Sequence, residues 1–192
     1  MNTLIWAGSI LAILTYLPLW KQIRTGKADQ NLFSWVLWCI LDAIAAATIV
    51  AQGGNFLLPM VYTVGSFVTS LFISRSGNKA SWTWFETLVA SLVLVSMMIW
   101  YFSGDKIATI ASTLAMLIAG IPQLIDAWKK PQNMPFLVYI SYVVANCLSI
   151  AGGKNWSIKE RFYPVAAGAI CFLLTALAAR KFWLKPAPTD VV

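Results

Sequence analysis

The sequence predicts an all-α integral membrane protein with seven transmembrane helices. Of its 192 residues, 59% are hydrophobic and only 11% are charged, whereas soluble domains carry about a quarter charged residues. The apolar residues form seven runs of roughly 17–23 residues, and each run is long enough to cross a hydrocarbon core of about 30 Å. The predicted spans are residues 3–20, 32–52, 56–74, 82–103, 107–126, 135–151 and 162–184.

A pattern of proline, aromatic and polar residues occurs twice in the chain, 104 positions apart. Pro18 matches Pro122, Trp35 matches Tyr139, Trp38 matches Tyr142, and Asp42 matches Asn146; further on, Phe67 matches Phe172 at an offset of 105. An internal repeat of this kind determines the architecture. Both copies begin in a helix that ends in a basic loop, so the copies are parallel, and one extra helix must separate two three-helix units.

We therefore expect a 3+1+3 arrangement of two parallel triple-helix-bundle repeats. Parallel repeats are a known plan of transporters, in which the substrate is held near the membrane midplane between the repeats. The expected units are a first repeat at 1–81, a linker transmembrane helix at 82–104, a second repeat at 105–185 and a short cytoplasmic tail at 186–192.

The basic residues predict the orientation in the membrane. Ten of the 14 Lys and Arg residues follow the first, third, fifth and seventh spans, and four lie on the opposite side. Because positive charge collects on the cytoplasmic side, we expect the N-terminus outside and the C-terminus in the cytoplasm. The expected location is the bacterial inner (plasma) membrane. The net charge of +7 then reflects orientation, and no nucleic-acid partner is expected.

Asp42 lies near the middle of the second span and is the most informative single residue. A charge at that depth costs roughly 2.5–3.5 kcal/mol on insertion scales, and no Lys, Arg or His lies deep in any span to pair with it. The carboxyl group is therefore either protonated or in contact with a hydrated cavity. Both states suit a proton-coupling residue, or an anchor for a cationic or hydroxyl-rich substrate. The alternative is a neutral aspartic acid that hydrogen-bonds a neighbouring helix.

An aromatic face precedes the polar residue in each copy. Trp35, Trp38 and Asp42 share one helix face, and Tyr139, Tyr142 and Asn146 do the same. Such a face suits a ring or a sugar, through apolar stacking and a few placed polar atoms. The substrate-binding candidates are Trp38, Asp42, Tyr142, Asn146 and, in the third span, Ser66. Asn146 is equally explained as a contact between helices, and Ser66 as a site of close packing.

Pro18 and Pro122 each lie about one turn before the cytoplasmic end of a span. Proline removes a helical hydrogen bond and clashes with the carbonyl four residues back, so the matched pair predicts hinges that open a cytoplasmic gate. Gln123 and Asp126 lie beside Pro122 and are candidates for the same gate. The alternatives are that proline is simply common in membrane helices, and that Asp126 marks a solvated helix end.

The sequence offers no chemistry typical of an enzyme. The chain has no histidine, which removes His-based metal sites and Ser/His or Cys/His catalysis. Its three cysteines show no metal-ligand or redox spacing. We therefore expect no catalytic residues, no metal and no cofactor.

The second copy of the repeat, Gly120-Ile121-Pro122-Gln123 followed by a basic loop, resembles the signature of the PQ-loop superfamily, which includes the SWEET sugar transporters. The first copy reads Leu17-Pro18-Leu19, with leucine in place of the glutamine. The helix count, the orientation and the proline loops extend the resemblance over nearly the whole chain. It implies alternating access through kinked first and fifth helices, with substrate bound between the two bundles.

Two functions follow from this resemblance and from the residues above. The first is a transporter for a small polar solute, such as a sugar, an amino acid or a vitamin-like compound, with proton coupling through Asp42. The second is a non-transporting receptor or sensor that binds a ligand or a partner protein. The expected partners are a small-molecule solute and the lipid bilayer, and a homo-oligomer remains open.

Overall fold

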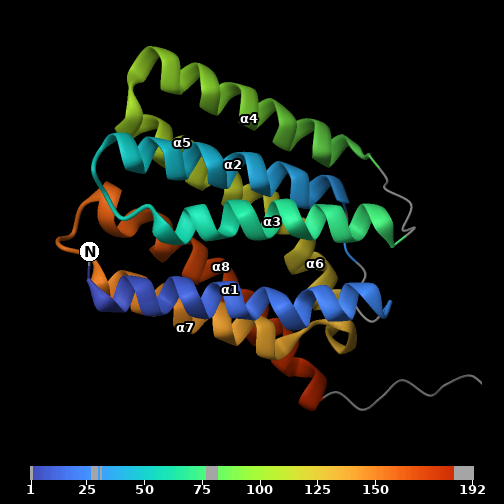
Figure 1. Cartoon of the computed structure of the whole chain (residues 1–192). Helices are drawn as coiled ribbons and strands as arrows, with labels where there is room; N and C mark the ends of the chain where they lie inside the picture. The colour runs from blue at the N-terminus through green and yellow to red at the C-terminus, as the bar shows by residue number, and fades with distance from the viewer. Residues whose placement is uncertain (1, 27–29, 31, 77–81, 184–192) are drawn as a thin grey trace, which may run out of the picture.

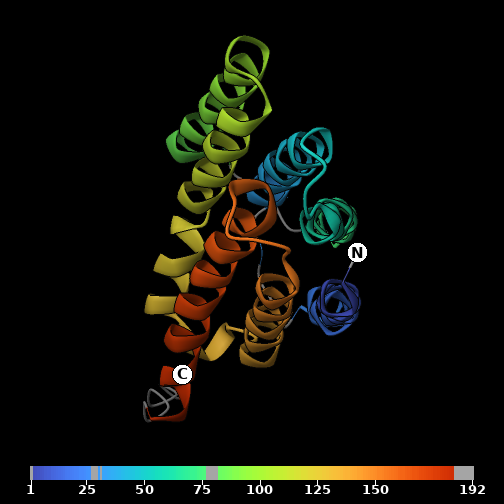
Figure 2. The same ribbon diagram turned by 90° about the vertical axis from the view of Figure 1, so that its left-hand side faces the viewer.

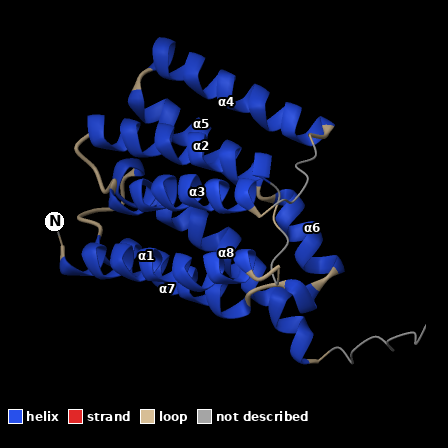
Figure 3. Cartoon of the chain, turned by 45° about the vertical axis from the view of Figure 1, so that its right-hand side comes forward, coloured by secondary structure: helices blue, strands red, loops and turns tan. Residues whose placement is uncertain are grey.

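The computed structural model describes residues 2–26, 30, 32–76 and 82–183, and their regular structure is entirely helical (Figure 3). The predicted tail at 186–192 and the basic residues Lys27, Lys79 and Lys185 lie outside the described residues. The helices are α1 (Thr3–Arg24), α2 (Leu32–Ala51), α3 (Leu57–Arg75), α4 (Trp84–Ser103), α5 (Asp105–Ala119), α6 (Ile121–Lys129), α7 (Phe136–Gly152) and α8 (Tyr163–Ala179). Two 3₁₀ turns (Pro131–Asn133 and Arg180–Phe182) and a π-helical turn (Ile158–Phe162) complete the regular structure of this part.

Six of the predicted spans are long and apolar enough to cross a membrane, as an integral membrane protein requires. One of these six is the segment Asp105–Lys129, which consists of α5 and α6, and another is Ile158–Phe182. The remaining predicted span, 135–151, forms the shorter helix α7 of 17 residues. α7 begins directly after Pro135, because the residue before a proline is biased away from the helical conformation.

Local sequence fixes several helix ends. At the start of α4, the hydroxyl of Thr83 accepts a hydrogen bond from the Phe85 N–H, and Glu86 accepts one from the Thr83 N–H, which makes a capping box. Between α4 and α5 the chain reverses at Gly104, whose φ of +78° suits glycine because it lacks a Cβ.

The fifth predicted span, 107–126, was expected to be one helix but is two. α5 ends at Ala119 and α6 begins at Ile121, with Gly120 between them and Pro122 at the start of α6. By contrast, α1 continues through Pro18. Of the two matched prolines, Pro18 therefore lies within a continuous helix, whereas Pro122 lies just after an interruption.

Two of the described helices, α3 and α8, each pack against several others. α3 packs against both α1 and α2, and α8 packs against α7, α5 and α6. Between these two groups, α1 packs against α7 and α2 packs against α5. The end-on view shows α4 at one edge of the bundle (Figure 2), where it contacts α5 and α2.

We call the two ends of the bundle the basic end and the far end. At the basic end, α1, α3 and α6 finish in Arg24, Arg75 and Lys129 (right in Figure 1). The far end carries the loop between α2 and α3 and the π-helical turn before α8 (left in Figure 1).

The far end is closed by direct contacts between these two segments. The Asn55 N–H donates to the Lys159 carbonyl oxygen at 2.9 Å, and Asn55 Nδ2 donates to Ser149 Oγ at 3.0 Å. Lys159 Nζ donates to the Gln52 carbonyl oxygen at 2.9 Å. A Cβ at Gly54 would lie 2.3 Å from the Lys159 carbonyl oxygen, so only glycine permits this approach. With Asn55 only 2% exposed, the seal is a packed interface.

Candidate functional site

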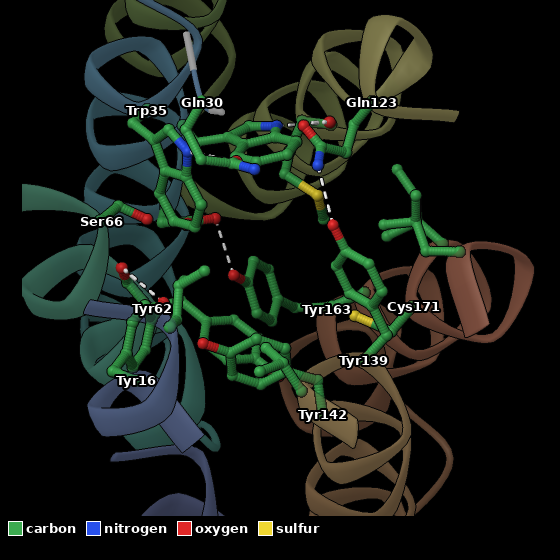
Figure 4. A pocket seen from close by; sticks show the side chains of 18 residues that line it. Tyr16, Gln30, Trp35, Tyr62, Ser66, Gln123, Tyr139, Tyr142, Tyr163 and Cys171 are labelled. Carbon is green, nitrogen blue, oxygen red and sulfur yellow. Dashed lines mark hydrogen bonds between the residues drawn. The ribbon is translucent and has the colours of Figure 1, made fainter. Parts of the chain in front are cut away.

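A cavity lies inside the bundle between the α1–α3 group and the α5–α8 group (Figure 4). Its volume of about 90 Å³ is room for several water molecules, at ~10–15 Å³ for one water. The lining side chains are Tyr16, Leu19, Gln30, Trp35, Trp38, Asp42, Tyr62, Ser66, Met116, Gln123, Val138, Tyr139, Tyr142, Tyr163, Ala167, Ile170, Cys171 and Leu174. Many of these lie where α1 ends and where α2, α6 and α7 begin, so the cavity reaches toward the basic end.

Asp42 is the only carboxylate among these lining residues, and it is 5% exposed. The hydroxyl of Tyr163, at the start of α8, donates to Asp42 Oδ1 at 2.7 Å. No Lys, Arg or His is among the residues that line the cavity. A carboxylate at this depth therefore has a phenol as its partner and faces a space large enough for water or a small solute.

Asn146 does not line the cavity. Its side chain is fully buried, and its Nδ2 donates to the Tyr62 hydroxyl at 2.7 Å and to the Tyr142 carbonyl oxygen at 2.8 Å. Tyr62 and Tyr142 both line the cavity. Asp42 and Asn146 thus hold the same kind of partner, because Asp42 bonds the hydroxyl of Tyr163 on α8 and Asn146 bonds that of Tyr62 on α3.

Four tyrosines form a cluster on the wall of the cavity. The ring centroid of Tyr142 lies 5.5 Å from that of Tyr16 and also 5.5 Å from that of Tyr62. The ring centroids of Tyr62 and Tyr163 lie 6.2 Å apart. Tyr16 fits here because its neighbour on α3 is Gly65, where a Cβ would lie 2.1 Å from the Tyr16 ring.

Two glutamines hold aromatic side chains at the basic side of the cavity. Gln123 Nε2 donates to the Tyr139 hydroxyl at 2.8 Å (Figure 4). Trp35 Nε1 donates to Gln30 Oε1 at 3.0 Å. Trp35 and Tyr139 are matched residues of the repeat, so each copy pairs a glutamine with the same aromatic position. The first copy takes its glutamine from position 30, because position 19, which matches Gln123, is leucine.

Trp38 connects the cavity wall to α5. Its indole Nε1 donates to the Met116 carbonyl oxygen at 3.3 Å, and its ring meets that of Trp35 edge to face at 5.3 Å. The indole is half-buried, with part of its surface toward the cavity.

The structure brings together most of the residues predicted for binding. Trp38, Asp42, Ser66 and Tyr142 line the cavity. Of the residues predicted for the gate, only Gln123 lines it; Pro18 and Pro122 lie in α1 and α6 away from the lining, and Asp126 is exposed.

The sequence analysis missed Tyr16, Tyr62, Tyr163 and Gln30. Tyr16 and Tyr163 lie near the ends of predicted spans, where tyrosine is common as a membrane-interface residue. Gln30 lies in a loop with no motif around it. The one signal in the sequence is Tyr62, whose hydroxyl falls well inside a span and so requires a polar partner.

No protein-family model matches this chain, and neither a curated protein nor a solved structure matches it. The fold and the cavity describe a helical membrane protein with an aromatic internal cavity whose lining holds one carboxylate.

Proposed function

We propose that the protein is a transporter that carries a small polar solute across the membrane by alternating access. The observation that carries the proposal is the cavity between two helix groups, with the buried carboxylate of Asp42 in its wall. A buried cavity with a few placed polar groups is the usual form of a small-molecule site, and an intramembrane carboxylate is a functional hypothesis by default.

The two groups are, in this proposal, parallel halves of a PQ-loop-like architecture with seven spans. The first half is α1–α3, α4 is the linker, and α5 with α6, α7 and α8 make the second half. The packing supports this division, because exchanging the halves leaves its pattern unchanged. The third helix lies between the other two in each half, and the first helix of each half packs against the second helix of the other.

The two ends of the bundle support an alternating mechanism. The far end is sealed by the contacts of Asn55 and Lys159, whereas the cavity reaches toward the basic end. In the proposed orientation the basic end faces the cytoplasm of a bacterial cell and the N-terminus lies outside. This conformation then corresponds to the state that exchanges solute with the cytoplasm, and opening the far seal produces the other state.

Asp42 carries the coupled proton in this proposal. The titratable side chains around it are tyrosines and cysteines, namely Tyr16, Tyr62, Tyr163, Cys39 and Cys171. None of these supplies a positive charge to hold the carboxylate permanently ionised. Solute and proton can therefore alternate at Asp42. The Tyr163 hydroxyl donates to the Asp42 carboxyl group in both its ionised and its protonated form.

Transport by proteoliposomes tests the proposal. Purified protein is reconstituted, and uptake of labelled glucose, lysine, nicotinamide riboside and choline is followed together with an internal pH dye. We expect flux of one compound with a matching proton signal, and loss of the proton signal in Asp42→Asn. Asp105→Asn is the matched control, because Asp105 lies outside the cavity and an amide oxygen still accepts from Trp100 Nε1.

Two results separate the proposal from its competitor. Binding of a compound by the wild type with no flux of any would favour a receptor or sensor. Flux in Asp42→Asn with an unchanged proton signal would reject proton coupling through this residue.

A further inference from the structure

The charge in the cavity wall restricts what can occupy it. Asp42 is its one carboxylate, and the lining contains no Lys, Arg or His. A phosphate or the carboxylate of an amino acid would enter without a cationic partner, and burying an unpaired charge is costly. A cation would find a partner in Asp42, and its burial would be compensated.

Aromatic rings form much of the remaining wall. Trp35 and Trp38 stand nearly perpendicular, at an interplanar angle of 89°, and Tyr62 and Tyr142 also meet at 89°. Perpendicular pairs present ring faces in more than one direction, as an aromatic cage does. Ring faces attract cations, most strongly those of Trp, and such cages recognise quaternary ammonium groups.

The hydrogen bonds of the site favour a cation that has few donors. A primary ammonium has three N–H donors to satisfy. Two acceptors of the wall are already engaged, since Gln30 Oε1 accepts from Trp35 and Asp42 Oδ1 accepts from Tyr163, whereas the Tyr142 hydroxyl has no hydrogen-bond partner among the described residues. A methylated ammonium needs no acceptor and buries its methyl groups against the rings.

From the cavity's charge, its rings and its engaged acceptors, we infer that the site takes a small organic monocation without a carboxylate, of the methylated-ammonium class. That the protein transports this cation rests on the proposed function, whereas that it binds the cation does not. Asp42 supplies the countercharge, and Trp38, one helical turn before it, supplies a ring face.

Binding to detergent-purified wild-type protein tests the inference without any variant. Choline and 3,3-dimethyl-1-butanol have nearly the same shape, but only choline is charged. We expect calorimetry to give a dissociation constant for choline at least about tenfold below that of the neutral analogue, because the charge contacts both Asp42 and the rings. Equal affinities, or binding of neither compound, would overturn the inference.

Variants then assign the roles of the two residues. We expect Asp42→Asn to weaken choline binding about tenfold or more, as loss of a buried charge partner does. Trp38→Phe keeps a ring, whereas Trp38→Leu removes it and should weaken binding roughly 2- to 30-fold relative to Phe. Equal binding by Phe and Leu variants, with both shown folded by gel filtration, would exclude the ring face.

Transport measurements distinguish this inference from the proposed function. Choline binding without choline flux in proteoliposomes would keep the ligand class and reject transport. Flux of glucose or lysine by a protein that does not bind choline would keep transport and reject the ligand class.

Discussion

The first and third helices of the two proposed halves meet at matching positions with side-chain sizes reversed. In the first half, Tyr16 of α1 lies over Gly65 of α3; in the second half, Gly120 lies under Ile170 of α8. Tyr16 and Gly120 are 104 positions apart, and Gly65 and Ile170 are 105 apart, as elsewhere in the repeat. A Cβ would lie 2.1 Å from the Tyr16 ring at position 65 and 2.0 Å from Ile170 Cδ1 at position 120. Each contact therefore needs one glycine. In the first contact the glycine lies on α3, and in the second it lies between α5 and α6, opposite α8.

This exchange gives the halves different properties. The large residue at position 16 brings a phenol ring to the cavity and stands in a helix that continues through Pro18. The glycine at position 120 stands two residues before Pro122, and there the helix is interrupted. Glycine costs about 1 kcal/mol relative to alanine in a helix. The Gly120–Pro122 segment therefore has a less stable helical conformation than the matching segment of α1 around Tyr16 and Pro18. The comparison teaches that α6 is better suited to move than the end of α1.

The largest effect should come from filling the glycine contact at position 65, and the contact at position 120 is the comparison. Gly65→Ala forces the Tyr16 ring to move, and we expect a loss of roughly 1–3 kcal/mol in the free energy of unfolding. Gly120→Ala meets the flexible end of Ile170 and, at 3.3 Å, the Leu117 carbonyl oxygen. It also gains helix propensity, so its change should stay within about 1 kcal/mol. Thermal unfolding in detergent, followed by tryptophan fluorescence, measures both.

A rescue variant controls the first of these changes. Tyr16→Leu in the Gly65→Ala background makes room for the new methyl group and should recover part of the lost stability. Equal losses in the two alanine variants would show that the exchanged sizes have no mechanical consequence.

The two prolines give the next largest expected difference. In a Cys39→Ala, Cys147→Ala background, Cys171 is the remaining thiol of the chain and lines the cavity. Pro122→Ala should slow its reaction with a small water-soluble thiol reagent several-fold, since α5 and α6 can then join. Pro18→Ala should change the rate by less than about twofold, because α1 is already continuous. A larger effect of Pro18→Ala would place the hinge in α1.

The smallest expected effect concerns the glutamine pairs. Gln30→Leu leaves the Trp35 N–H without its partner and should cost about 1 kcal/mol of unfolding free energy, because Trp35 lines the cavity, where water can replace the glutamine. Position 19 matches Gln123, so adding Leu19→Gln to that variant should restore part of the loss. Gln123→Leu is the matched change in the second half. If the double variant shows no recovery, a glutamine at position 19 cannot take the place of Gln30, and the two glutamine pairs are not equivalent.

The sequence was most informative where one residue carries a large energy. A carboxylate inside an apolar run is costly enough that the position of Asp42 in the chain alone predicts either a hydrated cavity or a hydrogen bond to a neighbouring helix, and the structure has both. Tyr16 could not be found in this way, because its position in the cavity depends on the rotation of α1, which the glycine at position 65 permits. The interruption at Gly120 was also missed, since the matched prolines alone predict equal helices.

The far seal has a consequence for the conditions under which the protein works. The charged Lys159 there bonds the Gln52 carbonyl oxygen, and Lys154 donates its backbone N–H to the Glu160 carboxylate at 3.1 Å. Asn55 bonds neutral groups across the seal. Contacts between buried or partly buried partners, such as these, are screened much less by dissolved ions than exposed charge pairs are. The closed end should therefore hold over a wide range of salt concentration.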